Sequence, residues 1–199
     1  MAVAPAVFVK LPSPCKALTA TTVDALVPEV KSKAGTSSTG GDPNNSSWCY
    51  WNGLKDLGVN GSTYRWLDVF FRRFGPQTGQ AGGEQPARDT YRKEVSKIRA
   101  TEGSRSLLVS PARGIGEEAT VLSYNTTAGA VQFRHADIVV RTGNVVMTLR
   151  YNGAGYEGAP TPDSSALTKS ALAAAREAVA SVAKANEIGR SSAQETVTP

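Results

Sequence analysis

Residues 131–151 decide the fold of this chain, and they read VQFRHADIVVRTGNVVMTLRY. A tight turn, Thr-Gly-Asn at 142–144, separates two apolar runs, which is typical of a β-hairpin. After the turn, every second residue is apolar and belongs to one face: Val145, Met147, Leu149 and Tyr151. This period of two predicts a strand with two distinct faces, paired antiparallel with the run at 130–141.

Further elements are predicted on both sides of this hairpin. Strands are expected at 48–51, 64–74, 106–109 and 119–124, and helices at 19–27, 86–99 and 163–186. Segments rich in small and polar residues predict connections at 31–47, 52–62, 75–84, 125–129 and 152–162. The C-terminal helix is rich in alanine, which lets it lie close against a sheet. We therefore predict an α+β fold in which helices cover an antiparallel β-sheet in two layers.

The length of 199 residues and the hydrophobic content of 40% fit a single domain with loose ends. We expect a disordered N-terminal tether at 1–13, one α+β domain at 14–188 and a disordered tail at 189–199. No apolar run approaches the roughly 20 residues that cross a bilayer. Residues 1–9 are too short and lack the basic residues of a signal peptide, so an exported protein would here be in a mature or trimmed form.

The chain has two cysteines, Cys15 and Cys49, and one histidine. These are too few for a standard zinc site, and the spacing excludes a C-x-x-C redox motif. The cysteines form either one structural disulfide, which requires an oxidising compartment, or two unrelated buried thiols. A disulfide would close a loop of 33 intervening residues. It would stabilise the fold by about 3–4 kcal/mol in the chain-entropy model.

The net charge of +5 is concentrated in one stretch of the chain. Residues 65–113 contain ten Lys/Arg and five Asp/Glu, whereas the rest of the chain is balanced. Such a stretch forms either a surface for anionic partners or the solvated face of a helix. It contains no recognised nucleic-acid-binding module, so we expect no nucleic-acid partner.

Catalytic patterns are scarce. His135 lies within a predicted strand, where a half-buried histidine is a simpler interpretation than a catalytic base. There is no G-x-S-x-G motif, and the adjacent Glu117 and Glu118 would diverge on a strand towards solvent. We therefore expect no enzymatic activity, no cofactor and no metal.

The aromatic residues between 48 and 66 either fill the core or line a cleft that stacks on a ligand. Asp68, Arg72 and Arg134 are strand charges that face either this cleft or the solvent. The candidate ligand-binding residues are Trp51, Tyr64, Trp66, Arg72 and Arg134.

Several of these segments resemble a known group of proteins. The stretch 131–151, the Ala-Ala-Arg-Glu-Ala run at 174–178 and the cysteine contexts Pro14-Cys15 and Trp48-Cys49 resemble actinobacterial secreted lipoproteins of unknown function. The same architecture is similar to the extracellular sensor domain of a mycobacterial serine/threonine kinase. The resemblance covers residues 12–187. The sequence departs from it in having no lipobox and no cysteines for the second disulfide of the kinase sensor.

The resemblance implies an exported, non-catalytic domain of the cell envelope with a ligand-binding or sensor role. We expect this domain to be a monomer. Its partner would be a small-molecule or anionic envelope ligand, and membrane association through an N-terminal anchor outside this sequence stays open. The alternative is a secreted protease inhibitor, with a rigid loop at 110–116 carrying Arg113, or a small hydrolase-associated protein.

Overall fold

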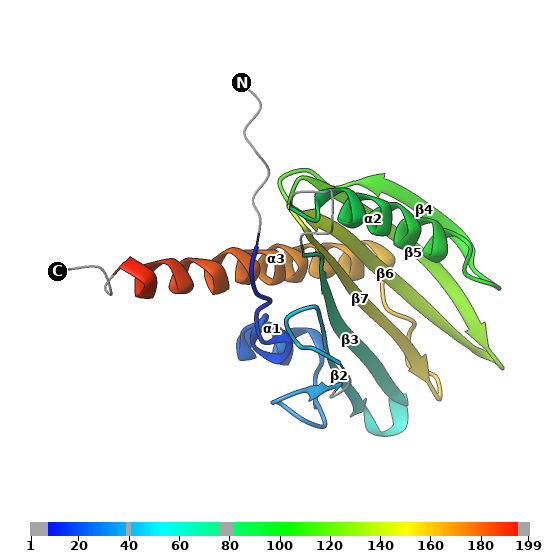
Figure 1. Cartoon of the computed structure of the whole chain (residues 1–199). Helices are drawn as coiled ribbons and strands as arrows, with labels where there is room; N and C mark the ends of the chain where they lie inside the picture. Colours follow the sequence, from blue (N-terminus) through cyan, green and yellow to red (C-terminus); the bar gives the residue numbers. More distant parts are fainter. Residues whose placement is uncertain (1–7, 39–40, 76–81, 195–199) are drawn as a thin grey trace.

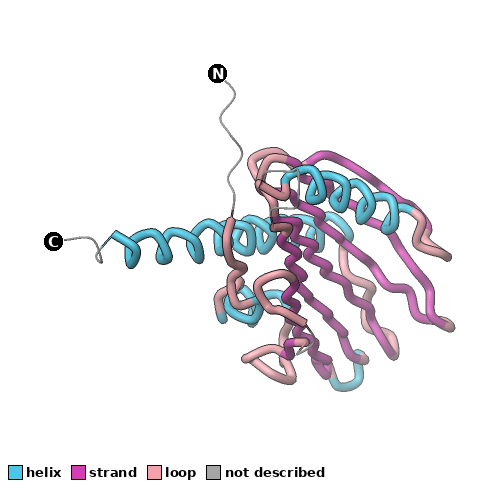
Figure 2. Tube along the Cα trace, viewed as in Figure 1, coloured by secondary structure: helices cyan, strands magenta, loops and turns pink. Residues whose placement is uncertain are grey.

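The structure is a computed structural model, and it describes residues 8–38, 41–75 and 82–194, with side chains described as far as residue 187. Seven strands form one antiparallel sheet in the order β1-β2-β3-β7-β6-β5-β4. The strands are β1 (Thr36–Ser37), β2 (Ser46–Asp56), β3 (Ser62–Arg73), β4 (Arg105–Pro111), β5 (Glu118–Ala128), β6 (Val131–Thr142) and β7 (Val145–Tyr156). The helices are α1 (Ala20–Leu26), α2 (Glu84–Arg99) and α3 (Ser164–Gln194), with 3₁₀ turns η1 (Pro14–Lys16) and η2 (Gly58–Asn60). The predicted α+β fold is confirmed, and β7 of the predicted hairpin is the central strand (Figures 1 and 2).

The two faces of the sheet are covered differently. The alternation predicted for β7 is confirmed, because Val145, Met147 and Leu149 face the main core with α1 and α3. Helix α2 packs on the opposite face, where Ala87 and Ile98 meet a smaller apolar cluster. Figure 1 accordingly shows α2 and α3 on opposite sides of the sheet. The helices therefore lie on both faces, and α2 covers only one end of its face.

Helix α3 lies against the sheet through small side chains. The residues of its buried stripe are Leu167, Ala171, Ala174, Ala175, Ala178 and Val182. Alanine combines high helix propensity with a short side chain, so the helix axis comes close to the strands. The helix continues to Gln194, six residues into the segment expected to be a disordered tail, and residues 195–199 lie outside the described part of the chain.

The predicted disulfide is confirmed between Cys15 and Cys49. It joins η1 to β2 on the face that α1 and α3 cover, and the Cys49 side chain is fully buried there. The expected tether at 1–13 is wrong for residues 8–13, because Phe8 and Leu11 are buried in the same core. Residues 1–7 lie outside the described residues.

The strands are longer than the sequence predicts. Strands β2, β5 and β7 continue into segments expected to be connections, at 52–62, 125–129 and 152–162, and end at Asp56, Ala128 and Tyr156. Glycine often marks a turn, but Gly53 and Gly155 lie within strands at points where another backbone segment comes close. A Cβ at Gly53 would lie 2.5 Å from the Pro28 carbonyl oxygen, and one at Gly155 would lie 2.1 Å from that of Ala159. Glycine is required at both positions because the adjacent backbone segment leaves no room for a side chain.

Glu117 and Glu118 do not diverge towards solvent as expected. Both form ion pairs with Arg141 of β6, which is almost completely buried. Glu84 at the start of α2 lies near the same guanidinium. This network fastens α2 and the start of β5 to the β6–β7 hairpin. Of the connection expected at 75–84, residues 76–81 are outside the described residues.

Candidate ligand-binding groove

The part of the α2 face that no helix covers is lined by polar and aromatic side chains. Paired residues of antiparallel strands project on the same face, so the register shows which side chains meet. One row across the sheet contains Tyr50, Asp68, Arg150 and Asp137. The next row contains Asn52, Trp66, Asn152, His135 and Tyr124. We call the surface formed by these two rows, together with Trp48, the sheet groove.

Two buried carboxylates flank one arginine in the floor of the sheet groove. Asp68 and Asp137 are each only 2% exposed. Arg150 lies between them, and its Nε donates to Asp68 Oδ1 at 3.0 Å. Trp66 Nε1 donates to the other oxygen of Asp68 at 2.9 Å. The Tyr124 hydroxyl donates to Asp137 Oδ2 at 2.9 Å.

Aromatic rings form the two sides of the sheet groove. On the β2–β3 side, Tyr50 stacks on Trp66 at 4.5 Å between ring centroids, and Trp48 lies 5.0 Å from Tyr50. On the β5–β6 side, Tyr124 and His135 are parallel and 4.6 Å apart. The two stacks are carried by strands on either side of β7, so β3 and β6 are about 10 Å apart at two inter-strand spacings.

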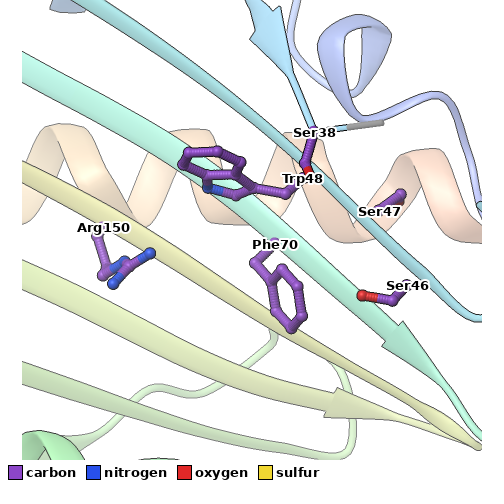
Figure 3. A pocket seen from close by; sticks show the side chains of 6 residues that line it. All are labelled: Ser38, Ser46, Ser47, Trp48, Phe70 and Arg150. Atoms are coloured by element: carbon purple, nitrogen blue, oxygen red, sulfur yellow. The ribbon is translucent and has the colours of Figure 1, made fainter. Parts of the chain in front are cut away.

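Two adjoining cavities occupy this surface. One of about 310 Å³ is lined by Trp48, Trp66, Asp68, Tyr124, His135, Asp137, Arg150 and Asn152. A second of about 300 Å³ is lined by Ser38, Ser46, Ser47, Trp48, Phe70 and Arg150 (Figure 3). Trp48 and Arg150 belong to both cavities, so the hollow continues from the charged floor towards β2.

Burial changes the protonation of the groove residues. It raises the pKa of Asp137 to about 7, although the hydrogen bond from Tyr124 and the charge of Arg150 oppose the rise. It also raises the pKa of Asp68, against the influence of Arg150. It lowers the pKa of His135 to about 4. Near neutral pH the imidazole is therefore uncharged, and Asp137 is close to half protonated.

Three of the five candidate residues from the sequence lie on the face of the sheet groove. Trp66 lines the cavity above the charged floor. Tyr64 lies next to it in a cluster with Phe133 and Tyr156, at 6.3 and 6.5 Å between ring centroids. Arg72 is further along β3 and covers the ring of Phe74.

The other two candidates point away from the sheet groove. Trp51 is 1% exposed and belongs to the main core, because it alternates with Trp48 and Tyr50 along β2. Arg134 pairs in register with Gly153 and Asn125 on that same opposite face, and it donates to Asn125 at 3.2 Å. The prediction that Trp51 and Arg134 line the groove is wrong, because both side chains lie on the opposite face of the sheet. Successive residues of a strand point to opposite faces, so an offset of one residue reverses the face.

Much of the groove floor differs from the set of residues predicted from the sequence. Asp137 and Arg150 were not candidates, although a two-residue turn at 143–144 pairs Thr142 with Val145 and therefore Asp137 with Arg150. This pairing was available from the sequence only with a two-residue turn, and the turn predicted at 142–144 is one residue longer. The contribution of β2 and β3 was not available from the sequence, because their position beside β7 depends on the whole sheet.

The groove contains no recognisable metal site. Among residues 8–38, 41–75 and 82–194, no group of three or more His, Cys, Asp or Glu side chains could hold a metal ion. In the same ranges, no helix is long and apolar enough to cross a membrane.

Comparisons with known proteins give one structural likeness. No protein-family model and no curated protein matches the sequence. The solved structure of LpqN, described as involved in cell envelope biogenesis of Mycobacterium tuberculosis, is similar over 72% of this chain and 86% of that chain. The sequence identity is 11% and the TM-score is 0.38. The resemblance to a kinase sensor domain finds no support in these comparisons and stays a prediction.

Proposed function

We propose that this chain is an exported, non-catalytic domain that binds a small ligand reversibly in the sheet groove. The observation that carries the proposal is the pair of buried carboxylates, Asp68 and Asp137, under a hollow with aromatic sides. Burying charge costs free energy that a purely structural sheet face would avoid. Concave surfaces with a few converging polar groups and shifted pKa values are typical of binding sites.

The disulfide supports the proposed location. Structural disulfides such as the one between Cys15 and Cys49 persist in oxidising compartments. They are rare in cytosolic proteins. We therefore propose an extracellular or cell-envelope location, with the chain acting as a monomer.

The surroundings of His135 support a binding role without catalysis. Its Nε2 lies 2.8 Å from Thr126 Oγ1, and among the described residues no carboxylate hydrogen-bonds to the imidazole. An imidazole with a pKa near 4 is also a weak general base at neutral pH. A hydroxyl and a histidine alone lack the orienting third group of a nucleophilic triad.

The three tryptophans allow a direct test. Trp48 and Trp66 line the sheet groove, whereas Trp51 is buried on the other face. In an NMR titration of the ¹⁵N-labelled chain with a fragment library and envelope extracts, a ligand should shift the indole N–H signals of Trp48 and Trp66 and leave that of Trp51 unchanged. Signals are assigned with single Trp→Phe variants. Shifts confined to other surfaces, or chemical conversion of the bound compound detected by mass spectrometry, would contradict the proposal.

A second candidate function is protease inhibition through the β4–β5 connection. Arg113 is exposed there, and Ile115, two residues later, is buried in the core, which would hold such a loop in place. Stoichiometric inhibition of trypsin that is lost in Arg113→Ala would favour this function. Cleavage after Arg113 without inhibition would eliminate it.

A further inference from the structure

We propose that the ligand of the sheet groove is an uncharged sugar, bound with neighbouring hydroxyl groups on Asp137 and Arg150. This inference rests on the proposed function and names its ligand class. It follows from the unused hydrogen-bonding groups in the groove floor, from the charges around them and from the aromatic sides.

The floor presents an unpaired acceptor. Asp137 Oδ2 receives the hydrogen bond from Tyr124, and among the described residues nothing donates to Oδ1. A carboxylate that is almost fully buried and half unpaired carries a free-energy cost. A ligand that donates a hydrogen bond to Oδ1 would remove part of this cost.

A donor lies directly beside that acceptor. Arg150 pairs in register with Asp137, and only its Nε is engaged, by Asp68. The side chain is 49% exposed, and its terminal nitrogens make no hydrogen bond to any described residue. The cavity therefore offers an acceptor and a set of donors on adjacent strands.

The charges of the floor disfavour ionic ligands. A phosphate or carboxylate would be attracted by Arg150 but would meet two acidic side chains, Asp68 and Asp137. An ammonium group would be attracted by the acids but repelled by Arg150. Because Asp137 is close to half protonated near neutral pH, the net charge of the floor is small. A hydroxyl group both donates and accepts, so two neighbouring hydroxyls match this pair without adding charge.

The size and the sides of the cavity also suit a sugar ring. A volume of about 310 Å³ lies at the lower end of the range for small-molecule sites. Trp48 and Trp66 on one side and the Tyr124–His135 stack on the other provide apolar surface for the C–H groups of the ring. Asn152 adds one more donor and acceptor at the floor.

The test compares sugars that have the same ring but differ in charge. Neutral pentoses, hexoses and their disaccharides are titrated into the ¹⁵N-labelled full chain, each beside its amino-sugar and uronic-acid counterpart. We expect at least one neutral sugar to shift the Trp48 and Trp66 indole signals. Its charged counterparts should bind about tenfold or more weakly.

Matched variants then locate the contact. Asp137→Asn turns the free acceptor into a donor, and Arg150→Gln removes the terminal guanidinium, so each should weaken sugar binding about tenfold or more. Arg134→Gln makes the same change on the opposite face, and it should leave the dissociation constant within about twofold. Thermal unfolding of each variant shows whether it is folded.

The outcomes separate the two proposals. If a lipid fragment or an anion shifts the groove tryptophans and no neutral sugar does, the sugar inference is overturned and the proposed function stands. If no probe of any class shifts them, both are overturned. If Arg134→Gln weakens sugar binding as much as Asp137→Asn, the sugar binds elsewhere and the inference fails.

Discussion

At the scale of single residues, the sheet groove places two side chains with opposite pKa shifts on one strand. Asp137 and His135 are two positions apart on β6, so they project on the same face. Between about pH 4 and 6.5 the folded protein keeps a proton on Asp137 and none on His135. In the unfolded chain the aspartate is ionised and the histidine is protonated over this range. Unfolding therefore transfers a proton from one group to the other with little net uptake or release.

This pairing predicts how stability depends on pH. The raised pKa of Asp137 gives stability that is complete below pH 3.8 and is lost as the pH rises towards 7. The lowered pKa of His135 gives stability that is present above pH 6.5 and is lost as the pH falls towards 4. In the wild type, the two contributions to the slope of unfolding free energy against pH have opposite signs.

Replacing either residue alone should reveal the pH dependence that the other residue contributes to the unfolding free energy. Relative to wild type, the unfolding free energy of His135→Gln should fall as the pH rises from 4.5 to 6.5, by up to about 1.4 kcal/mol per pH unit. That of Asp137→Asn should rise over the same interval. Urea unfolding followed by tryptophan fluorescence at several pH values measures both. Parallel profiles for the three proteins would contradict the assigned protonation states.

At the scale of elements, how much the sequence predicted depends on the range of the contacts. The hairpin β6–β7 and the helices were predicted because alternation, turn residues and helical spacing are local signals. It is harder to predict from the sequence which face of the sheet a strand side chain lies on. The sequence predicts Trp51 and Arg134 as ligand-binding residues, but both lie on the helix-covered face of the sheet. The partner of Arg150 on β3, Asp68, is 82 residues away in sequence, and only the assembled sheet order brings them together.

The disulfide should contribute a large part of the stability of the β2 region. Replacing both cysteines, Cys15→Ser with Cys49→Ser, should lower the unfolding free energy by about 3–4 kcal/mol, since the loop of the unfolded chain is no longer closed. Urea unfolding with and without a reducing agent provides the measurement. The reductant should lower the midpoint of the wild type and leave the double variant unchanged. An equal response of both proteins would show that the bond is not the cause.

The close approach of α3 to the sheet predicts sensitivity to side-chain size. Ala175 is fully buried against the strands, so Ala175→Leu should destabilise the fold by about 1–3 kcal/mol through overpacking. Ala183 on the exposed side of the same helix is the matched control, and Ala183→Leu should change stability by less than about 0.5 kcal/mol. Thermal unfolding of the two variants tests this, and equal midpoints would mean that the buried stripe is loosely packed.

At the scale of the whole molecule, two asparagines fasten the start of the described chain to distant elements. Asn144 in the β6–β7 turn accepts from the Phe8 amide at 2.7 Å and donates to the carbonyl groups of Phe8 and Phe74. Asn186 of α3 accepts from the amide groups of Val9 and Lys10. This explains why a segment that looks like a tether in the sequence is part of the core, since each partner is more than 130 residues away.

Loss of the Asn144 side chain should therefore weaken the whole fold. Asn144→Ala leaves the buried amide and carbonyl groups of Phe8 and the partly buried carbonyl group of Phe74 without their side-chain partner, and we expect a loss of about 2–3 kcal/mol. Asn60→Ala, at an exposed position in η2, should have almost no effect. Hydrogen exchange of the Phe8 amide, fast in the first variant and slow in the second, would show that the asparagine holds this segment. Equally slow exchange in both would contradict the assignment.

The division of the sheet into a structural face and a groove face has a consequence for how such a chain diverges. The disulfide, α1 and the alanine stripe of α3 all lie on one side, and Asp68 and Asp137 lie on the other. Under the proposed function, substitutions on the groove face would change the ligand preference and leave intact the contacts that hold the fold together. Burying these two acids costs free energy, so a related chain that does not bind the proposed ligand should carry aliphatic residues at both positions and unfold at a higher temperature.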